Sequence, residues 1–173
     1  MKEKKNNIIL IGMPGCGKTT LGTELSEKIG YGYVDSDSVL VARAGKRLNE
    51  IIAEVGREGF LDLEAKVNSE LCANRCVIAT GGSVVYRASA MEKLKLLGTV
   101  VYLKHPLEVI ARRLGDLQKR GVAMQEGFTL KDLYEERAPL YEKYADITVE
   151  LGDSSVQKAV EQITEALKKW TVL

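Results

Sequence analysis

The chain has 173 residues, of which 45% are hydrophobic and 28% are charged, and its formal net charge is +1 at pH 7. These values are typical of one globular domain covering residues 1–173. A net charge this small provides no broad field for nucleic acid or an acidic membrane surface, so we expect neither partner. The basic N-terminus lacks the long apolar core and cleavage site of a signal peptide, and no apolar run could span a bilayer, so we expect a cytoplasmic protein.

Short apolar runs alternate with helical patterns along the chain. Strands are expected at residues 6–12, 31–37, 75–83, 99–106 and 145–150. Helices are expected at residues 18–30, 38–44, 48–73, 88–98, 107–115, 129–144 and 154–170, with a break near 56–59. This order predicts a three-layer α/β fold with a five-stranded parallel sheet. In such folds ligands bind beyond the carboxyl ends of the strands.

The stretch "GMPGCGKTT" follows the first strand directly and matches G-x-x-x-x-G-K-[ST]. Its glycines allow successive backbone N–H groups to face a phosphate, and the next helix adds its positive N-terminal end. Lys18 is expected to reach the β- and γ-phosphates of ATP, and Thr19 to offer its hydroxyl to Mg²⁺. Cys16 is either a reactive thiol or simply a small residue that the loop accepts. The expected nucleotide-binding positions of this P-loop NTPase fold are Gly12, Gly15, Cys16, Gly17, Lys18, Thr19 and Thr20.

Two carboxylates, Asp35 and Asp37, end the second predicted strand. Because they are two residues apart on an extended chain, they point to the same side. One can lie by magnesium, and the other can accept the proton of an acceptor hydroxyl. Alternatively, "DSDS" caps the following helix, and both interpretations can hold because the cap and the site coincide.

The motifs in chain order resemble those of the shikimate kinase family. They are the phosphate loop, "YVDSD", "GREGFLDLE", "ATGGS", "RRLG", a polar segment containing "KR", and "ERAPLYEKYAD". The similarity extends from about residue 8 to about residue 163. It implies an ATP- and Mg²⁺-dependent kinase that acts as a monomer on a small, hydroxylated, carboxylate-bearing substrate. It also implies a mobile lid at about residues 116–128 and acceptor-binding helices at about residues 36–73.

The resemblance also implies individual roles. Asp37 matches the acid that binds the acceptor's hydroxyls, and Asp35 matches its partner near magnesium. Gly81 and Gly82 match glycines whose N–H groups face the acceptor. The remaining matches are three arginines: Arg120 of the lid closes over the transferring phosphate, Arg137 pairs with the acceptor's carboxylate, and Arg113 lies against the adenine.

Three departures from the family pattern fall on the acceptor side. Leu61 stands where the family has an arginine that grips the substrate carboxylate, while Glu64, which would orient that arginine, is present. Ser83 replaces the third glycine of a G-G-G turn, and the lid reads "RGVAM". Leucine cannot replace the bidentate grip of arginine. Arg57, four residues earlier on the same helical face, is either a substitute or a solvated residue.

These departures leave three alternatives open. The first acceptor expected is shikimate, phosphorylated to shikimate 3-phosphate. The second is another small hydroxylated metabolite phosphorylated by the same fold. The third is a nucleotide-binding regulatory module with little transfer activity, against which the retained Lys18, Thr19, Asp37 and Arg120 argue.

Overall fold

A five-stranded parallel sheet lies at the centre of the computed structural model, which describes residues 5–115, 121–170 and 172–173. The strands are β1 (Asn7–Ile11), β2 (Gly32–Asp35), β3 (Cys76–Ala79), β4 (Gly98–Lys104) and β5 (Ile147–Glu150). Their order in the sheet is β2-β3-β1-β4-β5, and every pairing is parallel. The predicted fold class is therefore confirmed.

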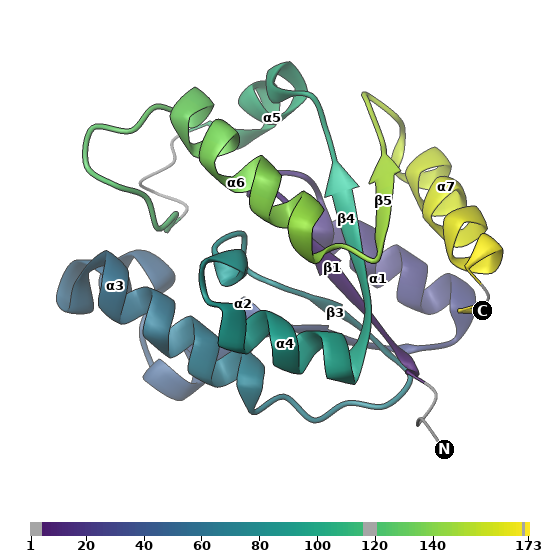
Figure 1. Ribbon diagram of the computed structural model, residues 1–173, viewed down its shortest axis with the longest axis horizontal. Coiled ribbons are helices and arrows are strands. Elements are labelled where there is room, and N and C mark those ends of the chain that lie inside the picture. Colours follow the sequence, from purple (N-terminus) through teal and green to yellow (C-terminus); the bar gives the residue numbers. More distant parts are fainter. Residues whose placement is uncertain (1–4, 116–120, 171) are drawn as a thin grey trace.

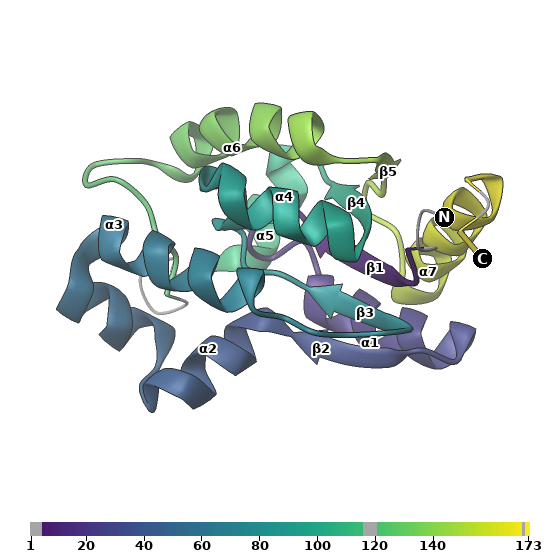
Figure 2. The same cartoon turned by 60° about the horizontal axis from the view of Figure 1, so that its bottom comes forward.

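Helices cover both faces of the sheet (Figure 1). They are α1 (Lys18–Ile29), α2 (Ser36–Ala44), α3 (Leu48–Ser69), α4 (Ala88–Leu97), α5 (Leu107–Leu114), α6 (Leu130–Tyr144) and α7 (Val156–Lys169). Figure 2 shows α4 and α6 on one side of the sheet and α1 on the other. Helices α2 and α3 pack against each other beside the sheet and form an arm at its carboxyl edge.

Burial explains why the strands are nearly continuous apolar runs. Ile8 to Ile11 are fully buried because β1 is the central strand and helices cover both of its faces. Most of the buried apolar side chains form one core around the sheet. A second apolar cluster joins α2 and α3 and contains Leu40, Ile51, Phe60 and Leu61.

Two predicted features of α3 have different outcomes. The predicted break is present, since Gly56 has φ 74° and ψ 175° inside the helix. The predicted end at residue 73 is wrong, because the helix ends at Ser69. Asn7 of β1 accounts for the early end: its Nδ2 donates to the Ala73 carbonyl at 2.8 Å and its Oδ1 accepts from the Cys76 N–H at 3.0 Å. These bonds anchor the bend before β3, in which Arg75 has φ 55°.

The segment after α5 carries the predicted lid. Residues 116–120, including Arg120, lie outside the described residues. Residues 121–129 are described, and they lead to α6, whose first turn Thr129 caps by accepting from the Asp132 N–H. An ideal Cβ on Gly121 would lie 2.7 Å from the Leu48 Cβ, so this segment touches the start of α3. In the described part of the chain, no helix combines the length and the apolar character needed to cross a membrane.

Candidate active site

A cavity of about 570 Å³ opens at the carboxyl ends of the strands. Most of the predicted site residues line it: Gly15, Gly17, Lys18, Thr19, Thr20, Asp35, Asp37, Gly81, Gly82, Ser83, Arg113 and Arg137. Its lining also includes Phe60, Glu64 and, from the segment after the undescribed residues, Gly121, Val122 and Ala123. Residues from seven separate parts of the chain therefore meet at the position that the topology favours.

The phosphate loop joins β1 to α1 and forms one end of the cavity. Gly15 and Gly17 have φ values of 79° and 90°, which side chains with a Cβ rarely adopt, so these turns need glycine. Lys18 is largely buried, and its Nζ donates to the carbonyls of Gly12 (2.7 Å) and Met13 (3.0 Å). Gly12 and Cys16 also belong to the loop but are not among the residues that line the cavity, and Cys16 is fully buried. The loop thus presents the start of α1 and Lys18 to the cavity.

Two oxygens that suit magnesium lie side by side next to the loop. The Thr19 hydroxyl donates to Asp35 Oδ2 at 3.2 Å. Asp35 Oδ1 accepts from the Ser38 N–H at 3.0 Å, so the same carboxylate also caps α2. A hydroxyl and a carboxylate oxygen are ligands that Mg²⁺ accepts together with phosphate oxygens and water. The donor set therefore fits the predicted ion, and the expected double role of Asp35 has a structural basis.

Asp37 lies deeper in the cavity, in the first turn of α2. Burial and the neighbouring charge of Asp35 raise the pKa of Asp37 to about 6, against an opposing effect of Lys18. The carboxylate is thus ionised at pH 7, and it is more basic than an exposed aspartate. These are the properties of a group that accepts a proton from a hydroxyl.

Glu64 of α3 faces Asp37 across Gly81. An ideal Cβ on Gly81 would lie 2.2 Å from Glu64 Oε1 and 2.6 Å from Asp37 Oδ1. Ser83 Oγ donates to Glu64 Oε2 at 2.6 Å, whereas Oε1 is buried without a hydrogen-bond partner. Burial and the charge of Asp37 raise the pKa of Glu64 to about 8. From the sequence, Glu64 was expected only to orient an arginine that is absent here, and its hydrogen bond with Ser83 was not predicted.

Arg137 of α6 also lines the cavity and is only 1% exposed. Its Nη2 donates to the Ala123 carbonyl at 2.5 Å, and its Nε donates to the Tyr86 hydroxyl at 3.2 Å. Nη1 lies beside Gly82, where an ideal Cβ would be 2.9 Å away. The guanidinium is therefore fixed in place, with one nitrogen directed at the glycine turn.

Arg57 and Leu61 of α3 are not among the residues that line the cavity. Leu61 is 1% exposed in the second apolar cluster. The Arg57 guanidinium lies 4.9 Å from the centre of the Tyr86 ring and pairs with Glu58 at 2.6 Å and Glu136 at 3.7 Å. Arg57 and Arg137 therefore both contact Tyr86, but only Arg137 lines the cavity.

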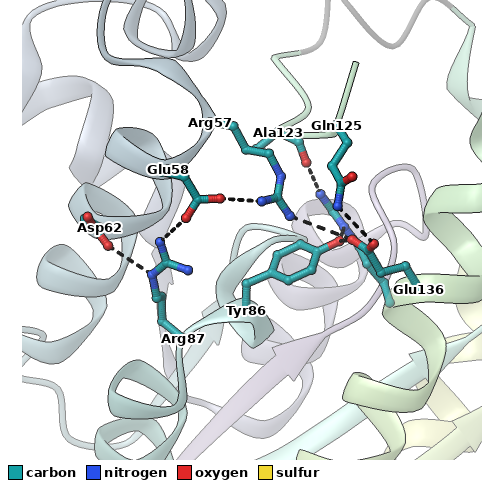
Figure 3. A network of polar contacts seen from close by, with 9 residues as sticks. Arg57, Glu58, Asp62, Tyr86, Arg87, Ala123, Gln125 and Glu136 are labelled. Atoms are coloured by element: carbon teal, nitrogen blue, oxygen red, sulfur yellow. Dashed lines mark hydrogen bonds and ion pairs between the residues drawn. The ribbon is translucent and has the colours of Figure 1, made fainter. Parts of the chain in front are cut away.

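A polar network joins this region to the segment after the undescribed residues (Figure 3). Glu136 accepts from the Tyr86 hydroxyl and from Gln125 Nε2, the latter at 3.4 Å. The network continues through Arg57 and Glu58 to Arg87. Helices α3 and α6 are thus tied together around Tyr86, a residue that no sequence motif indicated.

Comparisons with known proteins agree on one family. A family model described as "Shikimate kinase" matches residues 14–168. The shikimate kinase of Nostoc punctiforme is 38% identical over 170 residues, which are 94% of this chain and 93% of that protein. The structure of shikimate kinase from Acinetobacter baumannii in complex with shikimate is 32% identical, has a TM-score of 0.89, and aligns over 99% of this chain and 97% of its own. Shikimate kinase from Aquifex aeolicus aligns over 96% and 98% at 31% identity, with a TM-score of 0.77.

Proposed function

The chain belongs to the shikimate kinase family, and we propose that it transfers the γ-phosphoryl group of ATP to a hydroxyl of shikimate, giving shikimate 3-phosphate. The observation that carries the proposal is one cavity lined by the phosphate loop, Asp37 and Arg137. Such a lining would let a phosphate donor, a base and a carboxylate-binding cation meet in one cavity. In the transfer, the hydroxyl oxygen bonds to the γ-phosphorus, the bond to ADP breaks, and the hydroxyl proton passes to Asp37.

On the donor side, we assign the β- and γ-phosphates to the loop amides and Lys18. Thr19 and Asp35 would hold Mg²⁺, which neutralises charge on the phosphate oxygens when bound. Arg113 at the end of α5 lines the same end of the cavity and is assigned to the adenine. Arg120 is assigned to the transferring phosphoryl group, with the lid excluding water that would otherwise hydrolyse ATP. We further propose that the protein acts as a cytoplasmic monomer.

On the acceptor side, the acceptor's hydroxyls are assigned to Asp37 and its carboxylate to Arg137. The backbone N–H groups of Gly81 and Gly82 supply further donors. Arg57 is assigned an indirect role: it stacks on Tyr86 and pairs with Glu136, and both of these residues contact or adjoin Arg137. Holding an arginine in one geometry reduces the conformational entropy lost when it binds a carboxylate.

The position of Leu61 supports a second candidate, a kinase of the same fold acting on another small hydroxylated acceptor. A panel of alcohols assayed by coupled ADP release distinguishes the two. Shikimate is expected to give the highest kcat/KM, with phosphate on a single hydroxyl of the product. Negligible turnover of shikimate alongside robust turnover of another alcohol would overturn the first proposal.

A further inference from the structure

Glu64 is a buried carboxyl group that the proposed function leaves without a task. It is 2% exposed, it lines the acceptor end of the cavity, and its Oε1 has no hydrogen-bond partner. In the part of the chain that the structure describes, the one hydrogen bond of its carboxyl group comes from the Ser83 hydroxyl. A buried polar atom without a partner costs free energy unless a ligand satisfies it.

The surroundings of Glu64 favour its neutral form. The charged groups that face it are Asp37 from α2, Arg137 from α6 and Lys18 from α1. Burial and the Asp37 charge outweigh the two cations and hold the pKa of Glu64 at about 8, so the carboxyl group is protonated at pH 7. Since Ser83 already donates to Oε2, the proton belongs on Oε1, which then becomes a hydrogen-bond donor.

If Arg137 binds one oxygen of the acceptor's carboxylate, a second hydrogen-bond donor is needed for the other oxygen. Its Nε donates to Tyr86 and its Nη2 to Ala123, the guanidinium also interacts with Tyr141, and Nη1 lies next to Gly82. Because these contacts occupy several of the five guanidinium N–H groups, a carboxylate with two oxygens can use a second donor beside Nη1. Ionised Asp37 can only accept hydrogen bonds, so it suits the acceptor's hydroxyls and not its carboxylate.

We propose that protonated Glu64 binds the carboxylate of the acceptor, donating a hydrogen bond from Oε1 to one oxygen while Arg137 holds the other. The same role of Glu64 then accounts for two departures from the family pattern, Leu61 and Ser83. Leu61 stands where the family has an arginine that Glu64 would orient, and the Ser83 hydroxyl donates to Oε2 while Oε1 lies beside Gly81. A neutral acid supplies the donor that an arginine would otherwise supply, without adding charge.

The inference rests on the proposed function and makes binding of the acceptor depend on pH. Ionised Glu64 loses its donor and repels the carboxylate. With a pKa of about 8, the binding-competent fraction falls about tenfold between pH 7 and pH 9. Asp37, with a pKa of about 6, is already ionised throughout this range and contributes no change.

The test is titration calorimetry of shikimate binding at half-unit steps from pH 6.5 to 9, with ADP binding measured in parallel. The Kd for shikimate is expected to rise about tenfold between pH 7 and pH 9, while the Kd for ADP stays within about threefold. In Glu64→Gln the amide donates at every pH, so its shikimate Kd is expected to stay flat whatever its absolute value. Glu165→Gln, on the exposed face of α7, is the matched control and should retain the rise.

Infrared spectroscopy of the wild-type enzyme without ligand adds an independent reading. A protonated-carboxyl band present at pH 7 and lost by pH 9.5 is expected, and its absence at pH 7 overturns the inference. A flat Kd for shikimate in the wild-type enzyme also overturns it, while leaving the proposed function intact. Absence of both shikimate binding and shikimate turnover at pH 7 overturns the proposed function, and the inference with it.

Discussion

Replacing Glu64 by glutamine should stabilise the protein by an amount that depends on pH. Glu64 is 2% exposed, and its pKa is about 8 in the folded protein against 4.5 for an unperturbed glutamate. A carboxyl group whose pKa is raised on folding takes up a proton as the chain folds. The stability it contributes is complete below the unfolded pKa and is lost as pH rises through the folded pKa. Glutamine does not titrate and carries no such dependence.

The magnitude follows from the two pKa values. Between them, stability of the wild-type protein falls by about 1.4 kcal/mol per pH unit through this one group. From pH 5 to pH 7, the stability of Glu64→Gln relative to wild type is therefore expected to increase by about 2.5 kcal/mol. In a domain of this size, that change corresponds to a relative shift in Tm of about 5–10 °C. Above pH 8 the difference should level off.

Urea unfolding of both proteins at pH 5, 6, 7 and 8 measures the difference directly. The change with pH is the informative quantity, because any altered hydrogen bond in the variant shifts its stability equally at each pH. Asp37 titrates with the same sign between 3.8 and about 6 in both proteins, so the comparison removes much of its contribution. Parallel stability curves from pH 5 to pH 8 would refute the reasoning, since Glu64 would then take up no proton on folding. Glu165→Gln should run parallel to wild type.

The remaining predictions concern catalysis. Asp37→Asn should lower kcat by about 10²–10⁴ with ATP binding retained, and wild-type kcat/KM should fall below about pH 6 as Asp37 protonates. Arg137→Lys should raise the KM for the acceptor about 10- to 100-fold, since a lysine cannot reproduce the guanidinium geometry, while the KM for ATP is unchanged. Gly81→Ala should lower kcat/KM for the acceptor and leave ADP binding intact, because its Cβ would lie 2.2 Å from Glu64 Oε1.

Steady-state kinetics with each substrate varied in turn, together with calorimetry of ADP binding, check all three. A kcat for Asp37→Asn near the wild-type value would remove the base from the mechanism. Equal effects of Arg137→Lys on both KM values would indicate a general structural role. Wild-type turnover by Gly81→Ala would mean that the two carboxyl groups move apart easily.

The fold could be predicted from the sequence because its signals are local. Each apolar run predicts its own strand, and the phosphate loop predicts the start of α1. Gly30, with φ 69°, ends that helix. The end of α3 was wrong because bonds from Asn7, far away in the chain, decide it. The short 3₁₀ turn at Val84–Tyr86 was also missed, although it positions Tyr86.

The candidate site was predictable on the donor side and less so on the acceptor side. The phosphate loop and Asp35 lie on the same side of the molecule because each follows the carboxyl end of a strand in one parallel sheet, β1 and β2. Leu61, in contrast, turns into the apolar cluster beside Phe60, so its position in a binding motif does not place it in the cavity. The link between Glu64 and Ser83 joins residues 19 positions apart and has no sequence signature.

The place of β1 in the sheet has a consequence for synthesis of the protein. The first strand to leave the ribosome is the middle strand, and its neighbours β3 and β4 are translated later. Until Lys104 has emerged, the strand before the phosphate loop lacks one of its two hydrogen-bonded neighbours. Such non-local pairing slows folding and exposes the apolar Ile8–Ile11 run of a nascent chain. We therefore expect nucleotide affinity to appear late in translation. Stalled nascent chains that end before β4 should bind chaperones and should not themselves bind ATP.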